Sequence, residues 1–109
     1  MKQGTTPSLS LGTPYEPELW NLQRSWATFE QRGENLFSLR FDSEAITITA
    51  REAKPGSKVV VTLTQEQTLT MTTADTLKIE IRGIIGENKA VGSYILEIPV
   101  CKALKGGVI

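Results

Sequence analysis

Two pairs of carboxylates are the residues in this sequence whose types and spacing could do chemistry. Glu16 lies two positions before Glu18, and Asp42 lies two positions before Glu44. Paired carboxylates act as acid and base in glycoside hydrolysis, and carboxylate oxygens are common ligands of calcium. Each pair lies beside a turn, where acidic residues are expected for solvation alone. We therefore interpret all four as solvated residues, and we predict no catalytic residue and no metal site.

The composition excludes most other kinds of catalytic and metal-binding site. The chain contains no histidine, which is the commonest general base near neutral pH and a common ligand of transition metals. Its one cysteine, Cys101, can form no internal disulfide and no four-cysteine zinc site. Because Cys101 follows an alternating apolar run, a small packed or half-exposed strand residue is favoured over a reactive thiol. The sequence predicts no enzyme and no cofactor.

Aromatic residues offer a better indication of binding. Tyr15, Trp20, Trp26 and Phe29 cluster in the first third of the chain. An exposed tryptophan would suggest a surface for stacking sugars or docking a protein, so Trp20 and Trp26 are the candidate binding residues. The alternative, which we favour, is that both tryptophans fill the core between two sheets.

Charge and hydropathy narrow the class of partner. Twelve basic and twelve acidic residues cancel, so there is no basic field for nucleic acid, and little repulsion opposes self-assembly. No apolar run approaches the roughly 18 residues of a membrane span, and residues 1–7 lack the apolar core of a secretory signal. We expect no nucleic-acid or membrane partner and synthesis in a cytoplasm.

The stretch 76–82 organises the remaining elements. Leu77, Ile79 and Ile81 alternate with polar residues, which places the apolar side chains on one face of an extended strand. After a turn over 86–89 the alternation resumes with Tyr94, Leu96, Ile98 and Val100. The pattern predicts a β-hairpin over about 76–100.

Similar alternation predicts further strands over about 5–11, 24–31, 37–41, 46–50 and 58–63, whereas 18–22 is left as either a helical turn or an irregular crossover. Thr64 and Gln67 fit a capping box, which predicts one helical turn over 65–69. The sequence therefore predicts one all-β domain over 1–109, an antiparallel sandwich of about seven strands whose open edges can pair with another chain. The apolar end of the tail is expected either to dock or to fray.

Several segments resemble short proteins encoded in tail-gene clusters of phages and prophages of Gram-positive bacteria. They are the opening at 4–7, the strand and polar turn over 59–69, the strand over 77–82, and the ending at 105–109. The resemblance implies an immunoglobulin-like β-sandwich in the virion, similar in plan to the N-terminal domain of baseplate upper proteins. It also implies a structural role without catalytic residues.

We therefore expect a non-enzymatic structural protein of a phage or prophage virion, associated with the tail or baseplate. It would assemble through its edge strands and one apolar face, as a homo-oligomer and with other phage structural proteins. Two alternatives stay open. The first is a small module that binds carbohydrate or a host surface through Trp20 or Trp26. The second is a small enzyme that uses one of the carboxylate pairs.

Overall fold

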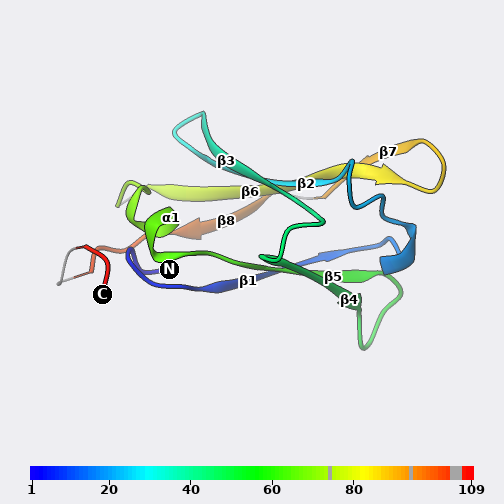
Figure 1. The fold of residues 1–109 in the computed structure, drawn as a ribbon, viewed down its shortest axis with the longest axis horizontal. Helices are drawn as coiled ribbons and strands as arrows, with labels where there is room; N and C mark the ends of the chain where they lie inside the picture. Colours follow the sequence, from blue (N-terminus) through cyan, green and yellow to red (C-terminus); the bar gives the residue numbers. More distant parts are fainter. Residues whose placement is uncertain (74, 94, 104–106) are drawn as a thin grey trace.

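The computed structural model describes residues 1–73, 75–93, 95–103 and 107–109, and it consists of two β-sheets packed face to face (Figure 1). Two short helical segments, η1 (Pro17–Leu19) and α1 (Gln65–Leu69), interrupt the strands. The strands of the described residues are β1 (Ser8–Thr13), β2 (Trp26–Gln31), β3 (Glu34–Arg40), β4 (Ile46–Ala50), β5 (Ser57–Thr62), β6 (Thr76–Ile85), β7 (Lys89–Gly92) and β8 (Leu96–Pro99). The all-β sandwich predicted from the alternation is confirmed.

Strand β6 is the centre of the larger sheet. One of its edges pairs with β2, which aligns Phe29 with Ile79. Its other edge pairs with β8 at residues 76–79 and with β7 at residues 82–85. The predicted hairpin over 76–100 is therefore confirmed, but its second strand is interrupted. Strands β7 and β8 pair with successive parts of the same edge of β6, so together they occupy one strand position of the sheet, which we call a lane. Ser93 lies at the interruption, where its hydroxyl accepts a hydrogen bond from the Ile81 amide at 3.0 Å. Tyr94 lies outside the described residues.

The strand order is that of an immunoglobulin-type sandwich. The smaller sheet has the order β1-β5-β4, and the larger has β3-β2-β6 followed by the lane of β7 and β8. Counted by lanes, the described strands number seven. Assigning these lanes the letters B, C, C′, D, E, F and G in chain order gives the sheets B-E-D and C′-C-F-G, as in immunoglobulin domains.

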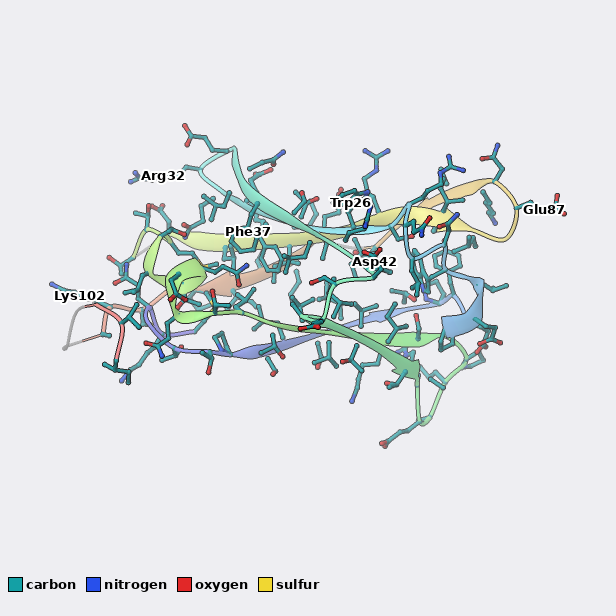
Figure 2. The ribbon with its side chains drawn as sticks, viewed as in Figure 1. Trp26, Arg32, Phe37, Asp42, Glu87 and Lys102 are labelled. Atoms are coloured by element: carbon teal, nitrogen blue, oxygen red, sulfur yellow. The ribbon has the colours of Figure 1, made fainter. Side chains whose placement is uncertain are left out.

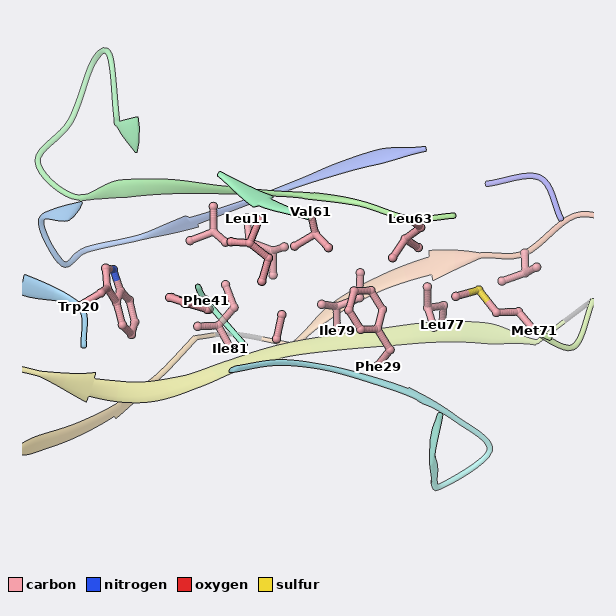
Figure 3. Close-up of a cluster of buried hydrophobic side chains, with 14 of the residues drawn as sticks. Leu11, Trp20, Phe29, Phe41, Val61, Leu63, Met71, Leu77, Ile79 and Ile81 are labelled. Atoms are coloured by element: carbon pink, nitrogen blue, oxygen red, sulfur yellow. The ribbon is translucent and has the colours of Figure 1, made fainter. Parts of the chain in front are cut away.

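The core lies between the inner faces of the two sheets (Figure 3). The residues predicted for the inner face of β6 are all buried, and Phe29 of β2 packs among them. Burying each such aliphatic or aromatic side chain stabilises the fold by about 1.5–3 kcal/mol. The other strands contribute Leu11 of β1, Ala27 of β2, Ile46 of β4, and Val59 and Val61 of β5.

The crossover between β1 and β2, which the sequence left undecided, begins with the 3-10 turn η1 and then runs beside β6. The Asn21 amide donates to the Ile84 carbonyl at 2.8 Å, and the Gly86 amide donates to the Leu19 carbonyl at 3.0 Å. Glycine at position 83 is required here, since an added Cβ would lie 2.2 Å from the Ser25 hydroxyl oxygen. The crossover is thereby held against the larger sheet.

Helix α1 has the predicted capping box. The Thr64 hydroxyl accepts a hydrogen bond from the Gln67 amide at 3.1 Å, and the Gln67 side-chain oxygen accepts one from the Thr64 amide at 2.8 Å. These bonds satisfy two amides at the helix start that have no partner within the helix. The helix then ends at Leu69, among the threonines at 68, 70, 72 and 73, whose β-branched side chains disfavour helix.

Both chain termini lie at the α1 end of the sandwich (Figure 1). The N-terminal segment pairs in parallel with the end of the larger sheet, where the Cys101 amide donates to the Met1 carbonyl at 2.8 Å. In the described part of the tail, the Ile109 amide donates to the Gln65 side-chain oxygen at 2.7 Å. The backbone of Ile109 is thus docked, whereas the side chains of Val108 and Ile109 are exposed.

Candidate functional site

The four candidate carboxylates lie in different settings. Glu16 accepts a hydrogen bond from the Gly56 amide at 3.3 Å, and Asp42 forms an ion pair with the Arg40 Nε at 2.7 Å. Asp42 raises the pKa of Arg40 above its ordinary value, mainly because it accepts the hydrogen bond from Arg40 and secondly because of its negative charge. Glu18 and Glu44 are exposed. Within the described ranges, no three or more His, Cys, Asp or Glu residues gather where they could hold a metal ion.

Cys101 is an exposed free thiol just beyond β8. Its backbone lies in a single bridge with Lys2, so it holds a strand-like position as expected. Of the alternatives considered for its side chain, a packed residue is wrong, since the side chain is exposed.

The two candidate binding tryptophans lie in opposite environments. Trp20 is 6% exposed in the core, where its indole N–H donates to the Ser57 hydroxyl at 3.1 Å. Trp26 is 42% exposed and lies on the outer face of the larger sheet (Figure 2). The expectation that both tryptophans fill the core holds for Trp20 and is wrong for Trp26. A ligand could therefore stack on Trp26 without disturbing the core.

Trp26 is flanked by arginines on both neighbouring strands. In the strand register it lies opposite Arg40 of β3 and opposite Arg82 of β6. A groove of about 300 Å³ runs beside it, lined by Arg24, Trp26, Thr28, Arg82, Gly83, Ile84, Ala90 and Val91. The alternation in β2 places Trp26 on the face opposite Phe29, but only the register brings the arginines beside it.

A second candidate surface is formed by the open sheet edges. In the part of the chain that the structure describes there are four such edges, and three of them are protected against pairing. Edge strands are commonly protected by charged side chains, by proline or by a β-bulge, and glycine within a strand weakens its pairing. Strand β3 begins at Glu34 and ends at Arg40, and its pairing with β2 contains a bulge. The lane of β7 and β8 contains Lys89 and Pro99. Strand β1 follows Pro7 and carries Gly12 under the guanidinium of Arg51.

Strand β4 is the fourth edge, and it has none of these protections. Its sequence is Ile-Thr-Ile-Thr-Ala, and it pairs with β5 in continuous register from Ile46 to Ala50. The Thr62 amide donates to the Ala45 carbonyl, and the Arg51 amide donates to the Gly56 carbonyl. Because antiparallel strands alternate their hydrogen-bonding direction, odd-numbered residues of β4 face β5, and Ile48 and Ala50 direct their backbone groups outward.

A third surface is a hollow of about 580 Å³ beside the β4–β5 connection, lined by Ser10, Leu11, Gly12, Thr49, Ala50, Arg51, Glu52, Ala53, Lys54 and Lys58. Three cations and one carboxylate border it. It lacks an aromatic side chain, and it overlaps the β4 edge through Thr49 and Ala50. It is therefore a weaker candidate for a specific small ligand than the groove beside Trp26.

Residues 46–50 were predicted as a strand, but their position at an edge was not. The sequence carries no signal for it, because a strand without charge, proline or glycine is more typical of the interior of a sheet. The arginines beside Trp26 carried no signal either, because Arg40 and Arg82 are far from Trp26 in the sequence.

Among the described residues, no helix has the length and apolar character needed to cross a membrane. Comparison of the chain with protein-family models, with curated proteins and with solved structures finds no match.

Proposed function

We propose that this protein is a non-enzymatic structural module that assembles with copies of itself through the free edge of β4. The observation that carries the proposal is the unprotected, regular edge of β4 in a sandwich whose other described edges are protected. In the setting implied by the resemblance, the assembly belongs to a phage or prophage tail or baseplate. Its further partners there are other virion structural proteins.

The sequence of β4 suits antiparallel pairing with a second copy. Centred on Ile48, such a pairing places Ile48 opposite Ile48, Thr47 opposite Thr49, and Ile46 opposite Ala50 of the other copy. Identical surfaces meet in this way across a two-fold axis. Thr–Thr and β-branched cross-strand pairs each stabilise a sheet by about 0.2–1 kcal/mol.

The backbone groups also match. The backbone N–H and C=O of Ile48 point away from β5, so the two copies of Ile48 exchange two hydrogen bonds at the centre of the pairing. The Ala50 amide of each copy can donate to the Ile46 carbonyl of the other. The Ile46 amide is already donated to the Ser43 carbonyl at 3.2 Å and does not take part.

The widths of the two sheets give a second reason for adding a strand at β4. The smaller sheet has three strands, whereas the larger has four lanes, with β3 at its edge. Phe37 and Leu39 of β3 pack against the core but remain partly exposed. A short connection over 41–45 links β3 to β4, so a strand added beside β4 widens the smaller sheet toward these side chains.

Light scattering combined with size-exclusion chromatography tests the proposal. We expect the wild-type mass to rise from one copy toward two as concentration increases. The variant T47K/T49K places like charges opposite each other twice and should be monomeric. The variant T47K/T49E places the new lysine at position 47 opposite the new glutamate at position 49 of the other copy, so it should recover the dimer.

The matched control is S8K/S10K, which adds the same two charges to exposed positions on the outer face of β1 in the same sheet. Its mass should equal that of the wild type. A wild-type chain that stays monomeric at all concentrations contradicts the proposal. So does a loss of the dimer in S8K/S10K equal to the loss in T47K/T49K, since net charge rather than the β4 edge would then be responsible.

A further inference from the structure

The groove beside Trp26 lies on the outer face of the larger sheet. Strand β4 belongs to the smaller sheet, which forms the other layer (Figure 1). The lining of the groove combines the exposed indole with the apolar side chains of Ile84 and Ala90, which lie opposite each other on neighbouring strands. An exposed indole beside aliphatic side chains provides a flat apolar surface of the kind on which sugar rings stack. This part of the groove therefore suits a ring with one apolar face.

The cations of the groove are available to a ligand. Arg24 and Arg82 both line it, and no carboxylate is among the lining residues. Neither guanidinium has a hydrogen bond or ion pair with another described residue. Arg40, which lies on the other side of Trp26, is instead engaged by Asp42. A free guanidinium binds carboxylate or phosphate through two parallel N–H donors.

We propose that this groove binds a saccharide bearing a carboxylate or a phosphate group. The ring stacks on Trp26, and the anionic group binds Arg82 or Arg24. A bare anion would leave the indole unused, and a neutral sugar would leave the guanidinium groups without a partner. The inference is independent of the proposed assembly, because it uses the other sheet.

The surroundings limit the ligand to one with few charges. Thr28 and Glu80 form the next cross-strand row along the sheet, and Glu30 and Lys78 form the row after that. Glu30 and Glu80 line a neighbouring groove of about 220 Å³ that continues along the same face, together with the cations Lys78 and Arg82. The two carboxylates offset the two cations there, so no basic field continues along the strands to hold a densely charged chain. The site therefore favours a sugar with an isolated anionic group over nucleic acid.

Nuclear magnetic resonance of the two indole N–H groups tests the proposal on the full chain. The probes are digalacturonic acid for the carboxylate, glucose 6-phosphate for the phosphate, cellobiose as the neutral sugar, and inorganic phosphate. We expect at least one of the two anionic sugars to shift the Trp26 resonance while the Trp20 resonance stays in place. Cellobiose and inorganic phosphate should bind at least about tenfold more weakly, since each lacks one of the two contacts.

Substitutions locate the site. W26A should abolish binding, and R82Q or R24Q should weaken it by about fivefold or more, because each removes a charged donor. R51Q, in the hollow beside β4, is the matched control and should bind as the wild type does. T47K/T49K should also retain binding, which separates this proposal from the assembly through β4.

Three results would overturn the proposal. The first is the absence of any Trp26 shift with both anionic sugars at millimolar concentration. The second is equal binding of cellobiose, which would leave no role for the arginines. The third is binding that survives R24Q and R82Q together.

Discussion

Trp20 and Trp26 are the same residue type, six positions apart, and the fold treats them in opposite ways. Trp20 lies between the sheets, 5.1 Å from the ring of Phe41 and 5.8 Å from that of Tyr15, measured between centroids. Trp26 lies on the outer face, and no ring contact joins it to another described aromatic side chain. Ser25, which is buried against Gly83, separates the crossover that buries one indole from the strand that exposes the other.

The difference shows how the polar atom of an indole is accommodated. Inside the sandwich, the N–H of Trp20 needs a partner, and the Ser57 hydroxyl supplies it. Ser57 also hydrogen-bonds the Thr13 hydroxyl at 2.7 Å, so all three side chains form one buried polar cluster. The N–H of an exposed indole can bond to water. Trp20 therefore contributes to stability, whereas Trp26 is free to contribute to binding.

Removing Trp20 should lower the free energy of unfolding more than any other change considered for the two tryptophans. We expect W20A to lower the free energy of unfolding by about 3–5 kcal/mol, because it opens a large cavity between the sheets. Urea unfolding followed by circular dichroism measures the change. W20F, which keeps most of the ring volume, should fall between W20A and the wild type. Equal stability of W20A and the wild type would contradict the core role.

Removing the partner of Trp20 should have a smaller effect. S57A leaves the buried indole N–H without an acceptor, which should cost about 1–3 kcal/mol of unfolding free energy. In the W20F background the same change should cost less, since phenylalanine has no N–H to satisfy. A double-mutant cycle from urea unfolding gives this coupling. Additive effects would show that the bond between Trp20 and Ser57 contributes little.

Removing Trp26 should have the smallest effect on stability. We expect W26A to change the free energy of unfolding by less than about 1 kcal/mol, because it removes an exposed side chain and its cross-strand contacts only. The same urea titration serves as the measurement. A loss as large as that of W20A would mean that Trp26 is a structural residue, and its exposure would then give no support to a binding role.

The two tryptophans differ in how far their positions could be predicted. Alternation in β2 puts Trp26 and Thr28 on the face opposite Ala27 and Phe29, so the relative placement was available from the sequence. Which face points inward was not, because a strand with a large aromatic residue on each face can be buried on either. The crossover carrying Trp20 has no periodicity, and its position depends on hydrogen bonds to residues of β6 and the turn after it, more than 60 positions away.

The strands and the helical turn were determined by interactions between residues that are close in the sequence. A period of two in apolar residues gives a strand with one buried face, and the hydroxyl of Thr64 with the amide of Gln67 caps α1 through contacts only three positions apart. The tertiary structure alone decided that β4 is an unprotected edge, that β7 and β8 share one lane of β6, and that two arginines flank Trp26. These features depend on which strands become neighbours, and strand pairing is fixed by burial across the whole sandwich.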